Sequence, residues 1–219
     1  MSRKRIGVVL SGCGNRDGAE IHESVLTLYF LDRAGAEAVC MAPDVPQRMV
    51  LNYLTGKPSG ESRNVLLESA RIARGKIQEL SQVKAEQLDG LILPGGSGAA
   101  LNLSSYGVDG PKGQVNPALA ALLTAMHRGK KPIGAICISP AVVAMVFAGQ
   151  GIHLTLGPDP DDARALQSMG QQAAVTQVES IVVDETHNVI STAAYMCAAS
   201  VAEVGVGIEK LVAEVLKRA

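Results

Sequence analysis

The segment KPIGAICISP, residues 131–140, decides the fold because it joins an apolar strand, a single thiol and the start of a helix. Residues 133–136 are apolar and lead directly into Cys137. Pro140 marks the first turn of a helix over residues 141–147, since proline is tolerated in a first turn but not in a helix interior. We therefore expect a strand that ends in a cysteine at a sharp turn.

Cys137 is then placed against the N-terminus of that helix. The unpaired N–H groups and the positive end of the helix dipole favour a thiolate over a thiol, and cysteines in such positions titrate below the value of a free thiol. The local pattern therefore predicts an activated nucleophile with a lowered pKa. The alternative that it leaves open is a buried cysteine that serves as a small apolar side chain.

Outward from this segment, apolar runs of strand length alternate with helical patterns. We expect strands over residues 6–10, 38–42, 88–93, 133–136, 153–156, 173–176, 180–184 and 189–192, and helices over residues 19–33, 63–73, 117–128, 141–147, 161–169 and 198–218. Asn116 and Pro117 supply an N-cap and a first-turn proline. Repeated βα units predict an α/β fold with a doubly wound, largely parallel sheet and helices on both faces. We expect one domain over residues 1–219.

Composition excludes several classes of function. The 219 residues are 47% hydrophobic, and 20 basic against 21 acidic residues give a net charge of −1, so nucleic acid is an unfavourable partner. The apolar run at residues 6–10 is too short for a signal peptide, and no run approaches the length of a membrane span. We expect a soluble cytoplasmic protein without membrane contact. The four cysteines lack metal-ligand spacing, so we expect neither a metal nor a disulfide framework.

Three loops should meet where the strands end: residues 11–18, residues 94–98 and the turn at Cys137. In sheets of this type, ligands bind beyond the carboxyl ends of the strands, near the point where the strand order switches. The first loop has the spacing G-x-G-x-x-x-G, one residue longer than a dinucleotide fingerprint, so nucleotide binding is disfavoured. The three loops together predict one site.

The helix after the first loop carries a candidate partner for the thiol. Asp17 is predicted to cap this helix, with Glu20 as the reciprocal partner of a capping box. Glu23 shares a stripe with Leu26 and Phe30, so its carboxyl should be buried, and burial raises a carboxyl pKa. A protonated Glu23 beside a thiolate could donate a hydrogen bond and shuttle protons. The alternative is a solvated first-turn acid that serves the helix dipole.

The second loop, Pro94-Gly95-Gly96-Ser97-Gly98, allows close backbone approach. The N–H groups of Gly96 and Ile138 could form an oxyanion hole over a group attached to Cys137. A plain turn between strand and helix is the alternative. A phosphate cradle is disfavoured, because the loop lacks the Gly-Lys-Ser/Thr ending of a P-loop.

The Leu-Pro-Gly-Gly loop, the cysteine elbow and Glu23 together resemble the ThiJ/PfpI superfamily of class I glutamine amidotransferase-like proteins. Six short motifs, in the same order along nearly the whole chain, resemble one bacterial group within this superfamily. Its members are called isoprenoid biosynthesis proteins with an amidotransferase-like domain or glyoxalase ElbB. These motifs are Ser11-Gly12-Cys13-Gly14, Glu20-Ile21-His22-Glu23, Leu54-Thr55-Gly56, Arg63-Asn64-Val65-Leu66, Asn102-Leu103-Ser104 and Ala194-Tyr195-Met196.

This resemblance implies a flavodoxin-like fold, a homodimer, Cys137 as nucleophile and Glu23 as its hydrogen-bonded partner. It also implies cofactor-independent conversion of small 2-oxoaldehydes such as glyoxal into 2-hydroxy acids, with deglycation as a variant that uses the same intermediate. We expect the substrate to be bound by Gly95, His22 and Tyr195. A redox or stress sensor that is oxidised at Cys137 is the competing hypothesis.

The chain departs from the superfamily pattern at Gly157, where many members carry a histidine beside the nucleophile. Neither His153 nor His187 is followed by the glutamate of a glutaminase His-x-Glu pair, so glutamine hydrolysis and peptidase activity are disfavoured. His127 lies near a helix end and should serve the helix dipole. The glycine-rich segment 105–114 is predicted to be a lid or an interface segment.

Overall fold

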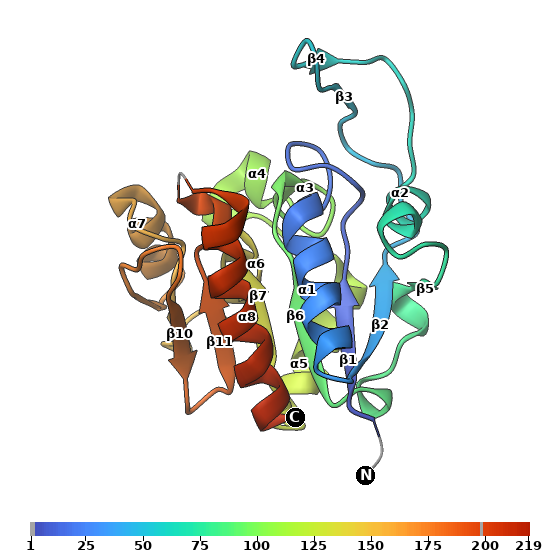
Figure 1. The fold of residues 1–219 in the computed structure, drawn as a ribbon. Coiled ribbons are helices and arrows are strands. Elements are labelled where there is room, and N and C mark those ends of the chain that lie inside the picture. Colours follow the sequence, from blue (N-terminus) through green and yellow to red (C-terminus); the bar gives the residue numbers. More distant parts are fainter. Residues whose placement is uncertain (1–2, 198) are drawn as a thin grey trace.

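The fold is organised around a seven-stranded sheet with the order β10-β11-β7-β6-β1-β2-β5 (Figure 1). The computed structural model describes residues 3–197 and 199–219. The strands of this sheet are β1 Arg5–Val9, β2 Glu37–Ala42, β5 Gln78–Glu79, β6 Gly90–Leu93, β7 Ile133–Ile136, β10 Ile181–Asp184 and β11 Val189–Thr192. Neighbouring strands are parallel, except that β10 and β11 are antiparallel. The predicted α/β class with a doubly wound, flavodoxin-like sheet is confirmed.

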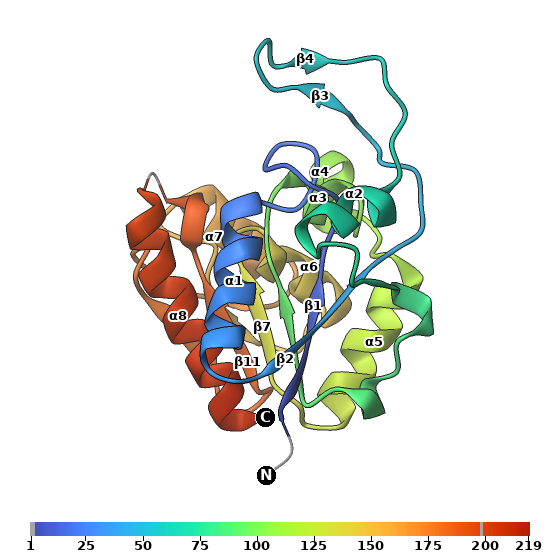
Figure 2. The ribbon, with the colours of Figure 1, turned by 45° about the vertical axis from the view of Figure 1, so that its right-hand side comes forward.

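Helices cover both faces of the sheet. Helices α1 Ile21–Arg33 and α8 Val201–Arg218 lie side by side on one face, and α5 Pro117–Arg128 and α6 Ser139–Val146 pack on the other (Figures 1 and 2). Side chains of successive strand residues point to opposite faces. In β1, Val8 therefore packs in the core under α1 and α8, whereas Val9 packs in the core under α5.

The remaining elements are short. They are the helices α2 Val65–Ile72, α3 Ser97–Leu101, α4 Tyr106–Asp109 and α7 Pro160–Ser168, the 3-10 turns η1 Leu80–Gln82, η2 Ala85–Gln87, η3 Gly110–Lys112 and η4 Ala194–Met196, and the two-residue strands β3 Leu51–Asn52, β4 Lys57–Pro58, β8 His153–Leu154 and β9 Gln172–Ala173.

Most predicted elements are present with shifted ends. The side chain of Asn116 accepts hydrogen bonds from two first-turn N–H groups of α5, so the predicted cap is confirmed. The strand expected from residue 88 begins at Gly90, and the one expected over residues 153–156 is two residues long. Residue 198, the expected start of the last helix, lies outside the described residues. Helix α8 begins at Val201 behind a capping box formed by Ser200 and Glu203.

The strands β3 and β4 form an arm, residues 44–64, that stands away from the sheet (Figures 1 and 2) and was not predicted. The arm is bonded near β3 to Asp17, whose carboxylate accepts hydrogen bonds from the Tyr53 hydroxyl at 2.7 Å and from the Leu51 N–H at 2.8 Å. The prediction that Asp17 caps the first helix is therefore wrong. Helix α1 starts only at Ile21, and Glu20 is its N-cap residue.

The segment 105–114 folds into the short helices α4 and η3. Its ends are joined by a hydrogen bond from the Ser105 N–H to the Gln114 carbonyl oxygen at 2.8 Å. Its role as a lid or interface segment stays a prediction.

Candidate active site

The strand order switches between β1 and β6, because the chain continues to β2 on one side and to β7 on the other. The loops after these two strands are bonded to each other there. The Gly98 N–H donates to the Gly18 carbonyl oxygen, and the Glu20 N–H donates to the Gly95 carbonyl oxygen, each at 2.9 Å. Cys137 follows β7, the neighbour of β6, so the three loops predicted to meet do meet.

Cys137 sits at a strained elbow between β7 and α6. Its φ angle is +61°, a left-handed conformation that costs free energy for a residue with a side chain. Two hydrogen bonds hold this conformation. The Cys137 N–H donates to the Thr192 carbonyl oxygen at 2.9 Å, and the Ser139 hydroxyl donates to the Pro94 carbonyl oxygen at 2.8 Å. Because strained residues persist only where their surroundings hold them, the elbow is a candidate functional feature.

Glu23 reaches the thiol from α1, and its side chain is fully buried. Its Oε2 accepts a hydrogen bond from the Gly95 N–H at 2.9 Å, its Oε1 accepts from the Tyr195 N–H at 3.4 Å, and the carboxyl is in hydrogen-bond contact with Cys137. A Cβ added at Gly95 would lie 2.4 Å from the Cys137 Cβ and 2.9 Å from the Glu23 Oε2. Gly95 is therefore glycine because the loop passes against both groups.

The environment of Glu23 favours its neutral form. Burial, and next the charge of Glu20, raise the pKa of Glu23 to about 8, although the N–H groups of Gly95 and Tyr195 oppose the shift. The expectation that Glu23 is buried with a raised pKa is confirmed. Near neutral pH this carboxyl is mostly protonated and can donate a hydrogen bond.

The environment of the Cys137 thiol corrects another expectation. Burial, and next the charge of Glu23, raise the pKa of Cys137 well above its usual value, so the predicted lowering at a helix N-terminus is wrong. The residue is only 7% exposed, and the loss of hydration outweighs the two N–H groups of Gly96 and Ile138, which are in hydrogen-bond contact with the sulfur. These are the N–H groups expected to form an oxyanion hole.

His22 and Tyr195 lie beside this pair. His22 is exposed on α1, and its Nδ1 is 2.8 Å from the Tyr195 hydroxyl oxygen. The Tyr195 N–H contacts Glu23, so η4 connects His22 to the buried carboxyl. The structure thus brings together Cys137, Glu23, Gly95, Gly96, Ile138, Tyr195 and His22. Sequence reasoning gave Glu20 only a capping role and gave Ser139 none.

The other candidate histidines, His127, His153 and His187, do not supply an imidazole to the Cys137 site. A Cβ added at Gly157 would lie 3.6 Å from the Cys197 Sγ, so a thiol occupies the neighbourhood of that position. His153 and His187 both bond to Asp184 instead: the His153 N–H donates to its carboxylate at 2.7 Å, and the His187 Nδ1 lies 3.0 Å from it. The rings of His127 and His187 are stacked with centroids 5.7 Å apart.

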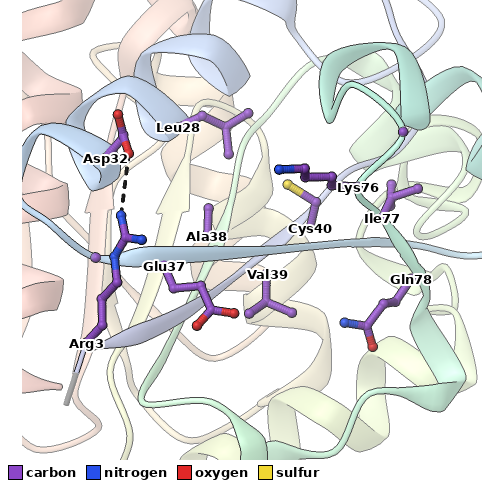
Figure 3. Close-up of a pocket in the computed structure, with 12 residues that line it drawn as sticks. Arg3, Leu28, Asp32, Glu37, Ala38, Val39, Cys40, Lys76, Ile77 and Gln78 are labelled. Carbon is purple, nitrogen blue, oxygen red and sulfur yellow. Dashed lines mark ion pairs between the residues drawn. The ribbon is translucent and has the colours of Figure 1, made fainter.

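A cavity of about 630 Å³ lies at the β2 side of the sheet, and Cys40 lines it together with Lys76 and the Arg3–Asp32 ion pair (Figure 3). None of its lining residues belongs to the Cys137 site. Burial alone raises the pKa of Cys40 to about 11, so this thiol is a poor nucleophile near neutral pH. Over residues 3–197 and 199–219, no cluster of three or more potential metal ligands is present.

Comparison with known proteins places the chain in a family. No family model matches the sequence. The human protein called glutamine amidotransferase-like class 1 domain-containing protein 3, mitochondrial, is 43% identical over 223 residues, which cover 97% of this chain and 82% of the human one. The chain belongs to the glutamine amidotransferase-like class 1 domain family. The ES1 protein homolog, mitochondrial, from Rattus norvegicus is also 43% identical, over 98% of this chain and 84% of its own length.

Solved structures agree with this assignment. The isoprenoid biosynthesis protein with amidotransferase-like domain from Ehrlichia chaffeensis superposes with a TM-score of 0.90 at 34% identity, covering 98% of this chain and all of that one. A ThiJ/PfpI domain protein from Brachyspira murdochii gives a TM-score of 0.61 at 16% identity, over all of this chain and 99% of that one, and so shares the fold. The predicted membership among class I glutamine amidotransferase-like proteins is confirmed, and the fold is the one that ThiJ/PfpI domain proteins have. In the part of the chain that the structure describes, no helix has the length and apolarity needed to cross a membrane.

Proposed function

We propose that this protein converts small 2-oxoaldehydes such as glyoxal into 2-hydroxy acids without a cofactor. The observation that carries the proposal is the contact between the Cys137 thiol, held at a strained elbow, and a buried Glu23 that is mostly protonated near neutral pH. A nucleophile beside a group that can hold and release one proton is what an internal redox isomerisation of glyoxal requires.

In the proposed reaction, the Cys137 sulfur adds to one aldehyde carbon, its proton passes to the new oxygen, and a hemithioacetal forms. The N–H groups of Gly96 and Ile138, which adjoin the sulfur, stabilise the developing oxyanion. The ionised form of Glu23 then takes a proton from the first carbon and returns it to the second through an enediol, which gives a thioester of the hydroxy acid. Water cleaves the thioester and restores the thiol, so glyoxal and water give glycolate. Adducts on glycated amines would pass through the same intermediate.

Burial at the site supports a small substrate. Cys137 is 7% exposed and Glu23 is fully buried, so a reactant with two carbons fits the surroundings better than a glutamine side chain of a peptide. We assign substrate contacts to Gly95, which adjoins both reacting groups, and to His22 and Tyr195 at the side of the pair.

Turnover of glyoxal by purified protein tests the proposal. Wild type should form glycolate, Cys137→Ser should abolish it, and Glu23→Gln should lower it at least a hundredfold, which is within the range attributed to general acid–base catalysis of about 10²–10⁴. Cys40→Ala, which removes a thiol outside the Cys137 site, is the matched control and should keep full activity. Wild-type turnover in Cys137→Ser would rule out the covalent mechanism.

A redox sensor remains the second candidate, favoured by the same Cys137–Glu23 contact. A carboxyl that donates a hydrogen bond would stabilise a sulfinate on Cys137, and peroxide would supply its oxygen atoms. Mass spectrometry after mild peroxide treatment should then find two added oxygen atoms on the Cys137 peptide and fewer in Glu23→Gln. Absence of oxidation at Cys137 would exclude this role.

We also propose a homodimer in the cytoplasm. An exposed apolar stripe on α1, formed by Ile21, Val25 and Tyr29 with 42%, 50% and 54% exposure, supports association with a second copy. Light scattering should give the dimer mass for wild type and the monomer mass for Val25→Glu, whereas a monomeric wild type would refute the homodimer.

The human and rat relatives carry the word mitochondrial in their names, so cell fractionation is the test of location.

A further inference from the structure

Glu20 is a buried carboxylate whose position goes beyond capping. It is 7% exposed, and its Oε2 accepts a hydrogen bond from the Glu23 N–H at 2.7 Å. Its own N–H donates to the Gly95 carbonyl oxygen at 2.9 Å, and Gly95 in turn donates to the Glu23 carboxyl at 2.9 Å. Glutamate is not among the favoured N-cap residues, which are serine, threonine, aspartate and asparagine. Capping alone therefore does not account for a glutamate here.

Besides the Gly95 N–H, the groups around the Glu23 carboxyl come from three elements. Glu20 belongs to the start of the same helix, Cys137 to the elbow after β7, and Tyr195 to η4, with His22 bonded to the Tyr195 hydroxyl. Among the ion pairs of residues 3–197 and 199–219, none includes Glu20. Its negative charge therefore acts on Glu23 without a neutralising ion pair.

We propose that Glu20 is a positioning residue that keeps a proton on the Glu23 carboxyl and thereby sets the pH range in which Cys137 reacts. The inference deepens the proposed function, since it rests on the same Cys137–Glu23 pair. Two buried negative charges close together repel, so a charged Glu20 makes ionisation of Glu23 unfavourable. The Glu23 carboxyl then remains a hydrogen-bond donor toward the sulfur at neutral pH.

The test measures Glu23 directly, by the pH titration of its carboxyl carbon in NMR spectra of protein labelled with ¹³C-glutamate. Wild type should titrate near pH 8, and Glu20→Gln should lower the midpoint by about one pH unit, the size expected for removing a nearby charge from a partly screened site. Between the two midpoints, alkylation of Cys137 by iodoacetamide, followed by mass spectrometry of its peptide, should be slower in Glu20→Gln than in wild type, because an ionised Glu23 disfavours the thiolate.

Control variants separate charge from structure. Glu20→Asp keeps the charge with a favoured cap residue and should keep the wild-type midpoint, and Glu203→Gln removes an acid from the capping box of α8 and should do the same. Should Glu20→Gln fail to fold, Glu20→Ser gives the same test with a favoured neutral cap. An unchanged Glu23 midpoint, or an unchanged alkylation rate of Cys137 between the two midpoints, in the neutral variants would overturn the inference. Neither readout needs glyoxal turnover, so failure of the proposed reaction would be seen separately.

Discussion

Gly95→Ala offers a sharp test of the geometry of the site. The added methyl group would lie 2.4 Å from the Cys137 Cβ, 2.8 Å from the Ile136 carbonyl oxygen and 2.9 Å from the Glu23 Oε2. Ordinary contacts of a Cβ begin near 3.4 Å, so Cys137 or the loop must move by about 1 Å. Overpacking of this kind costs about 1–3 kcal/mol, and a displacement of about 1 Å can cost about a hundredfold in rate.

The assay combines thermal unfolding with turnover of glyoxal. For a chain of this size, a loss of 1–3 kcal/mol corresponds to a Tm lower by about 2–12 °C, and kcat/KM should fall about a hundredfold. Gly205→Ala is the matched control, because its Cβ would meet nothing closer than 3.9 Å, and alanine favours a helix interior by about 0.5–1 kcal/mol. A Gly95→Ala protein with wild-type Tm and wild-type turnover would refute the described packing of this loop.

Three further predictions concern stability. Because the pKa of Glu23 is raised, the folded protein binds a proton that the unfolded chain releases between about pH 4.5 and pH 8, so the free energy of unfolding falls as the pH rises through this range. Urea unfolding of Glu23→Gln should lack this decline. An equal decline in Glu23→Gln would contradict the raised pKa of Glu23. Burial, and next the charge of His187, lower the pKa of His127, so the unfolded chain takes up a proton more readily than the folded protein. The free energy of unfolding should therefore fall as the pH drops below about 6.5. This fall should be smaller in His127→Gln, and an equal fall would exclude His127 as its source. Asn116→Ala removes the N-cap of α5 and should lower the free energy of unfolding by about 1 kcal/mol, which corresponds to a Tm lower by about 2–4 °C. An unchanged Tm would mean that the cap contributes little to stability.

The sequence predicted those features that neighbouring residues determine. Pro140 and Asn116 mark helix starts through backbone rules that act within one turn, and both are confirmed. The stripe that Glu23 shares with Leu26 and Phe30 was enough to predict that Glu23 is buried, because helical periodicity places these residues on one face.

Features that depend on distant segments escaped prediction. The thiol pKa of Cys137 depends on how completely loops far away in the chain enclose its sulfur, and the local helix N-terminus gave the wrong direction. The arm was missed because its strands are two residues long and carry no alternating pattern. The role of Asp17 was misassigned because its partner Tyr53 lies 36 residues further on.

The left-handed backbone of Cys137 places reactivity and durability in opposition at one residue. Glycine adopts this conformation without steric cost, so a Cys137→Gly chain should resist heat better than the natural one while losing its nucleophile. A selection for thermal endurance alone, blind to chemistry, would therefore tend to discard the thiol. Attempts to raise the thermal stability of this protein should therefore keep Cys137 and introduce substitutions at other positions.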